Sequence, residues 1–199
     1  MTGEPLPTQL LDGVGLLERA VDYALGSLDA VPGTDLHHPT PCADWDLRAL
    51  LDHLNDSLLA LHEAAALGRV FPDIGDYAAS AVDPVAVLRD RAVRLVGAWT
   101  PPEPRREVAF GELALTTAIV TTTGALEVAV HGWDVARACG ADRTIPAGLA
   151  ADILDIVPLL VAAADRPERF AAAVEPPFGA VPGDRLVAFL GRHPQWTYR

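Results

Sequence analysis

Residues 45–68 read WDLRALLDHLNDSLLALHEAAALG, and this stretch decides the fold class. Its apolar stripe consists of Leu47, Leu50, Leu51, Leu54, Leu58 and Leu61. Steps of three and four residues place these leucines along one face of an α-helix, with polar residues on the opposite face. Asp44 is the expected N-cap, and Gly68 is the expected end of the helix. The sequence therefore predicts an amphipathic helix that packs against other helices.

The same periodicity recurs along the rest of the chain. Further helices are predicted over residues 8–30, 83–99, 114–139, 147–164 and 184–191. Asp83-Pro84 and Asp184 are typical of helix starts, and we expect a bend at Pro158. The β-branched start of the 114–139 segment also fits an extended strand, and Gly140 stands where a C-cap would. No pair of alternating strands is evident.

These patterns predict an all-α fold, with an antiparallel bundle of four longer helices and one or two additional C-terminal helices. At 199 residues we expect a single domain over residues 1–199. An apolar helix face would also fit a homodimer interface.

Composition and charge exclude several classes of function. The net charge is −12, from 15 basic and 27 acidic residues, and the chain contains no lysine. A scattered set of arginines on an acidic chain argues against nucleic-acid binding. The apolar run at 156–164 is too short to span a membrane, and no signal peptide is visible, so we expect a cytoplasmic protein. Cys42 and Cys139 fit reduced thiols better than a disulfide.

A carboxylate and an imidazole lie four residues apart in EVAVHGWD, residues 127–134. On a helix, Glu127 and His131 share one face, and burying Glu127 in this apolar segment without a partner would be costly. His53, beside the leucine stripe of the 45–68 helix, would complete a His₂Glu set. Three protein ligands with open positions are typical of catalytic zinc sites, although nickel, iron or manganese would also accept these ligands.

Each of these residues also has a simpler interpretation. Most E-x-x-x-H pairs on helices are surface ion pairs, and His53 alone fits a half-buried, hydrogen-bonded histidine. Asp134 would either fix the ring of His131 as a hydrogen-bonded carboxylate or pair locally with Arg137. The remaining histidines are expected in loops or in solvent: His37, His38, His62 and His193.

Three separated blocks resemble one actinobacterial family. They are TPCADWDLRALLDH at 40–53, EVAVHGWDVARACG at 127–140 and DRLVAFLGRHPQW at 184–196. The chain is similar, in order and over nearly its whole length, to the metal-binding family related to the mycothiol-dependent maleylpyruvate isomerase N-terminal domain, within the DinB-like superfamily. The resemblance implies a four-helix bundle that holds a divalent metal, usually zinc, through His53, Glu127 and His131.

The resemblance also implies an activity. Relatives use the metal to activate the low-molecular-weight thiol mycothiol for transfer or for cis–trans isomerisation of a small electrophile. The isomerase has a further C-terminal domain, whereas only a short helix follows the bundle here. Thiol transfer, or another metal-dependent reaction in which the metal activates a thiol or water, is therefore the better expectation. A non-catalytic metal-binding bundle, acting as a sensor or scaffold, and a mycothiol-independent enzyme of specialised metabolism are the alternatives. A metal-free relative that binds an apolar ligand fits less well, because all three ligand residues are present.

Overall fold

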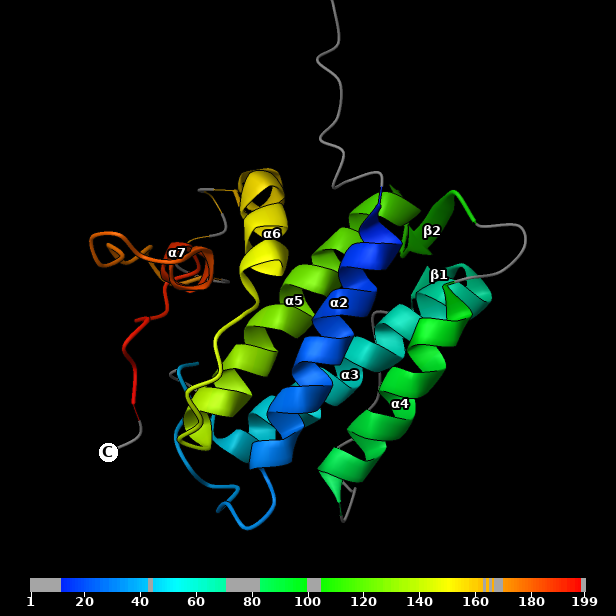
Figure 1. Ribbon diagram of the computed structural model, residues 1–199. Coiled ribbons are helices and arrows are strands. Elements are labelled where there is room, and N and C mark those ends of the chain that lie inside the picture. The colour runs from blue at the N-terminus through cyan, green and yellow to red at the C-terminus, as the bar shows by residue number, and fades with distance from the viewer. Residues whose placement is uncertain are drawn as a thin grey trace, which may run out of the picture.

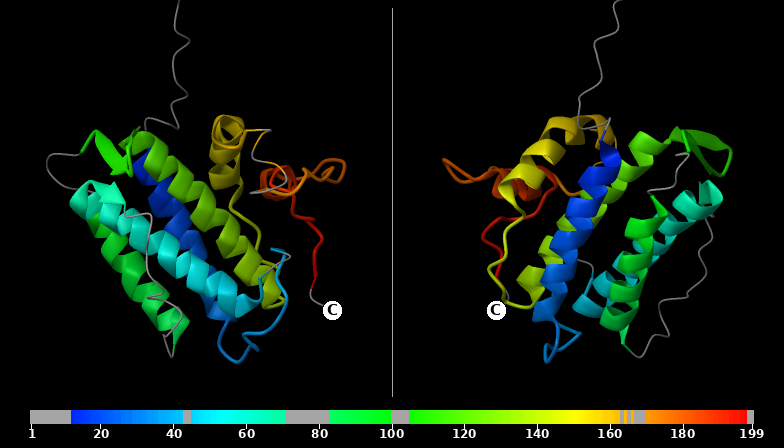
Figure 2. Two further views of the ribbon diagram at one scale, coloured as in Figure 1. Left: turned by 180° about the vertical axis from the view of Figure 1, so that it is seen from behind. Right: turned by 45° about the vertical axis from the view of Figure 1, so that its right-hand side comes forward.

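The computed structural model describes residues 12–42, 45–70, 83–99, 105–162, 164, 166 and 170–197. Four long helices lie side by side in it: α2 (Gly13–Ser27), α3 (Leu47–Leu67), α4 (Pro84–Ala98) and α5 (Thr117–Ala138) (Figure 1). A short 3₁₀ turn, Leu28–Ala30, follows α2. Two shorter helices lie on one flank of the molecule: α6 (Ala147–Leu160) lies next to α5, and α7 (Pro182–Phe189) packs against α6 (Figure 2). The molecule is therefore mostly helical, as predicted.

The four long helices form two parallel pairs. The colour gradient in Figure 1 shows α2 and α5 running downward, whereas α3 and α4 run upward. Within the first pair, Gly13 lies against Thr121 and Gly132 lies against Ala24, which fixes the parallel direction. The predicted antiparallel order therefore describes the two pairs relative to each other and is wrong within each pair.

The apolar stripe of α3 forms part of the core, as predicted. All six of its leucines are buried, and α5 is buried along most of its length between α2 and α3. Close approach of α2 and α5 depends on glycine, because a Cβ at Gly132 would lie 3.0 Å from the Cα of Ala24. The apolar character of residues 125–136 thus reflects a central helix with neighbours on several sides.

Helix ends follow the cap chemistry, with two corrections. Asp83 caps α4 as predicted, and Gly68 ends α3 with φ at 69°. The cap of α3 is Asp46, whose side chain accepts from the amide of Ala49, whereas the predicted cap, Asp44, lies outside the described residues. Asp184 lies within the first turn of α7, which begins at Pro182 and has no side-chain cap.

A small sheet corrects the all-α prediction. β1 (Arg69–Val70) pairs in parallel with β2 (Glu107–Phe110), which pairs antiparallel with β3 (Leu113–Thr116). A two-residue turn joins β2 to β3, and its Gly111 has a φ of 55°, which favours glycine. Of the β-branched residues at the start of the 114–139 segment, only Thr116 lies in β3, and those from Thr117 to Thr123 lie in the first two turns of α5.

Among the residues that the structure describes, no helix is long and apolar enough to cross a membrane. Cys42 and Cys139 are thiols that form no disulfide.

Candidate metal centre

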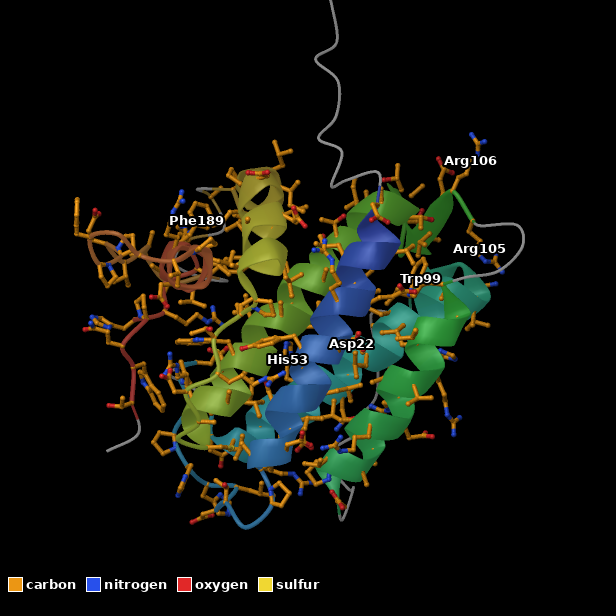
Figure 3. All side chains as sticks on the ribbon, viewed as in Figure 1. Asp22, His53, Trp99, Arg105, Arg106 and Phe189 are labelled. Atoms are coloured by element: carbon orange, nitrogen blue, oxygen red, sulfur yellow. The ribbon has the colours of Figure 1, made fainter. Side chains whose placement is uncertain are left out.

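Two helices supply three side chains that could hold a metal ion. His53 comes from α3, and Glu127 and His131 come from consecutive turns of α5; His53 is labelled in Figure 3. α3 and α5 run in opposite directions and pack against each other, so that the second turn of α3 lies beside the central turns of α5. The three side chains thus meet at one point.

The donor atoms of these side chains lie close together. The Nε2 atom of His53 lies 2.5 Å from Oε1 of Glu127, and the Nε2 atom of His131 lies 3.2 Å from the same oxygen. One ligand atom from each of the three residues lies within 4.8 Å of the other two. In the described part of the chain, no fourth His, Cys, Asp or Glu joins this group.

The site is closed on one side and open on the other. The His131 side chain is 7 % exposed, whereas those of His53 and Glu127 are 35 % and 32 % exposed. Trp45 packs against both imidazoles, with ring centroids 4.4 Å from His53 and 5.8 Å from His131. A small molecule could therefore approach the ligand atoms from the side of His53 and Glu127.

Asp134 lies behind His131 and is completely buried. Its Oδ2 atom lies 3.0 Å from Nδ1 of His131, so His131 donates through Nδ1 and presents Nε2 to Glu127. The guanidinium of Arg192 lies on the other side of this carboxylate, with Nη2 2.9 Å from Oδ2. A buried carboxylate is thus balanced by two donors.

The charges of the cluster shift its pKa values. Burial alone would raise the pKa of Glu127, but the two imidazoles beside it lower that pKa well below its usual range. Burial lowers the pKa of His131, but Glu127 and Asp134 outweigh this effect and raise it to about 9. Burial likewise raises the pKa of Asp134, and Arg192 and His131 more than reverse that. Both carboxylates are therefore ionised at neutral pH.

Comparison with known protein families identifies the family of this chain. Residues 17–136 match the model of the mycothiol maleylpyruvate isomerase N-terminal domain. The chain belongs to this family. The matched residues run from α2 almost to the end of α5 and include every member of the cluster, Asp134 among them.

Two relatives extend the similarity beyond the family model. Both are uncharacterized proteins of Mycobacterium tuberculosis, from strains CDC 1551 and H37Rv, and each is 28% identical over 185 residues. The aligned part covers 88% of this chain and 94% of each relative. A search of the solved structures found no match.

Four further histidines lie outside the cluster. His37 is exposed and pairs with Asp46 in the loop before α3. His38 lies near the carbonyl of Ala138, and His193 is exposed. His62, expected in solvent, is half-buried on α3. None of the four belongs to the group that could hold a metal.

Two features of the site were not predicted from the sequence. Arg192 approaches from the C-terminal segment, although it lies 58 residues from Asp134. No local pattern identifies such a partner, because a fully buried carboxylate only indicates that some cation lies nearby. Trp45 is the second feature, since its ring packs on both imidazoles. Trp45 precedes the N-cap Asp46 and lies outside α3, so helical spacing does not predict its position beside His53.

Proposed function

We propose that this protein binds a divalent metal, with zinc as the expected ion, through His53, Glu127 and His131, and uses it to activate a thiol. Under this proposal the four long helices form the DinB-like bundle of the family. Two imidazoles and one carboxylate are the ligand set of catalytic rather than structural zinc sites. The observation that supports the proposal best is the convergence of these three ligand atoms within 4.8 Å.

The arrangement of donors supports metal binding over a purely structural ion pair. Both imidazoles direct Nε2 to the carboxylate of Glu127, and His131 has its other nitrogen bonded to Asp134. A carboxylate behind a histidine fixes its tautomer and ring orientation, as is usual for metal-bound histidines. A simple ion pair would require neither the second imidazole nor this support.

The chemistry of the proposal is attack by sulfur on carbon. When bound, a divalent cation lowers the pKa of a coordinated thiol so that the nucleophilic thiolate predominates at neutral pH. The thiol proton leaves through the open side of the site to water. The sulfur then forms a bond to an electrophilic carbon of the substrate, and the leaving group departs with its bonding electron pair.

The chain's own residues define how substrates enter. Trp45 forms an apolar wall beside His53, and the exposed edges of His53 and Glu127 form the opening. Family membership supports mycothiol as the thiol. The competing proposals are a metal-binding bundle without catalysis and an enzyme of specialised metabolism that uses no mycothiol. The open side of the site favours an enzyme.

The test is a thiol-transfer assay with the zinc-loaded protein, mycothiol and an aryl halide whose absorbance changes on substitution. We expect a rate that depends on both zinc and mycothiol and that falls at least about 100-fold in Glu127→Gln and His53→Ala. His62→Ala removes a histidine from the same helix outside the cluster and should retain the parental rate. Tight metal binding with no turnover of any thiol would instead support the non-catalytic alternative.

A further inference from the structure

Arg192 links the C-terminal segment to the candidate metal centre. It follows α7 and lies outside the residues that match the family model. Its side chain is only 12 % exposed and reaches α5, where it meets the buried carboxylate of Asp134. A guanidinium buried at this depth needs a defined partner, because an unpaired charge there would be costly.

The contact between Arg192 and Asp134 uses both carboxylate oxygens. Nη2 of Arg192 lies 2.9 Å from Oδ2, and Nε lies 3.3 Å from Oδ1. A two-point contact of this kind fixes the plane of a carboxylate as well as its position. Oδ2 also receives the hydrogen bond from Nδ1 of His131, so the orientation of Asp134 determines that of the imidazole.

Arg192 is itself held in place from two further sides. Its Nη1 donates to the carbonyl of Leu190 at 3.2 Å, and its Nη2 lies 4.0 Å from the sulfur of Cys42. These contacts come from the end of α7 and from the loop before α3. The guanidinium is therefore a fixed point against which Asp134 can be oriented.

We propose that Arg192 is a positioning residue of the metal centre: through Asp134, it holds the His131 ring with Nε2 directed at Glu127. The effect on metal affinity rests on the proposed function, whereas the effect on the ring of His131 does not. Under this proposal the segment after α6 completes the centre, since the family-matched residues supply the ligands and Asp134 but not this cation.

Metal affinity of the full-length protein, measured with Zn²⁺ against a chromophoric chelator, gives the first test. Arg192→Met keeps an unbranched apolar stem and removes the guanidinium, and we expect about 10-fold weaker binding. Asp134→Asn should weaken binding by a similar factor. Because both act through the same contact, the double variant should be no weaker than the more affected single variant. Arg185→Met removes an exposed arginine of α7 and is the matched control.

The ring of His131 gives a second readout that needs no metal. In the metal-free parent and in Arg185→Met, the Nδ1 proton of His131 should appear downfield in the ¹H NMR spectrum and exchange slowly with water. Arg192→Met should broaden or lose this signal while remaining folded, as judged by far-UV circular dichroism. Arg192→Lys keeps a positive charge but lacks the guanidinium that contacts both carboxylate oxygens of Asp134, so it should keep only part of the signal.

The results distinguish a failure of the positioning role of Arg192 from a failure of the proposed function. Parental affinity and an unchanged Nδ1 signal in Arg192→Met would overturn the inference. Losses that multiply in the double variant would show that Arg192 does not act through Asp134. If the parent binds no metal but loses the Nδ1 signal on substitution of Arg192, the proposed function fails and the positioning role stands.

Discussion

At the scale of single residues, His131 has a different partner on each ring nitrogen. Nδ1 faces Asp134 and Nε2 faces Glu127, so the ring lies between two carboxylates. Both carboxylates favour the protonated imidazole, whereas a metal would require the neutral form. Metal and proton therefore compete for the same nitrogen of His131.

This competition predicts the pH dependence of metal binding. The pKa of His131 in the metal-free protein is raised to about 9, so the ring carries an extra proton at neutral pH. Affinity for Zn²⁺ should therefore rise as pH increases from about 6 to about 9, with roughly one proton released per metal bound at pH 7.5. Isothermal titration calorimetry in buffers of different ionisation enthalpy measures this proton release directly. A pH-independent affinity across this range would show that His131 is not a ligand.

At the scale of helices and strands, local sequence chemistry explains most element boundaries. Aspartate side chains cap α2, α3 and α4, and Gly68 ends α3 in a left-handed conformation. Asp46 and Asp184 both stand near a helix start, but only the side chain of Asp46 bonds to a backbone amide of its helix. Asp46 and Asp184 should therefore contribute differently to the free energy of unfolding.

Asp46→Ala should lower the free energy of unfolding by about 1 kcal/mol, because it removes the N-cap bond to Ala49. Asp184→Ala removes no cap bond, and its effect should stay within a few tenths of a kcal/mol, the size of a helix-dipole interaction. Urea denaturation followed by circular dichroism gives both values. Equal losses in the two variants would contradict the cap assignment.

Close packing of α2 on α5 predicts the effect of a single methyl group. In Gly132→Ala the new Cβ would lie 3.0 Å from the backbone of Ala24, which cannot move as a flexible side chain would. Overpacking of about 1–3 kcal/mol should exceed the helix-propensity gain of about 1 kcal/mol. Gly148→Ala, which meets nothing within 4 Å on the exposed side of α6, is the control and should not destabilise the protein. Thermal unfolding of both variants would test this, and a more stable Gly132→Ala would contradict the packing.

At the scale of the whole molecule, the helices and the shared face of Glu127 and His131 could be predicted from periodicity and spacing. The leucines of α3 and the Glu127–His131 pair repeat with the period of a helix, and that period is a local property. Other features depend on residues far apart in the sequence and could not be predicted in this way. They are the directions of the helices, the small sheet and the contact of Arg192 with Asp134. β1 has only two residues, Arg69 and Val70, so it shows no alternation that a sequence pattern could reveal.

Metal binding should stabilise the whole fold, because the proposed ligands come from two different helices. At a free metal concentration 100 times the dissociation constant, the gain should be about 2.7 kcal/mol. For a domain of this size, that corresponds to a Tm increase of roughly 5–10 °C. Scanning calorimetry with Zn²⁺ and with a chelator measures the shift, and Glu127→Gln should not show it. A Tm that is the same with both would argue against a site that joins α3 to α5.

The most direct test of the metal centre is the metal content of the purified protein, measured by elemental mass spectrometry. Expression with zinc, nickel, iron and manganese available should give close to one equivalent in the parent and in His62→Ala. His53→Ala and Glu127→Ala, each lacking one ligand, should contain almost none. A metal-free parent, or variants that retain the parental content, would contradict the account, and the cluster would then be a buried hydrogen-bonded pair with a second imidazole beside it.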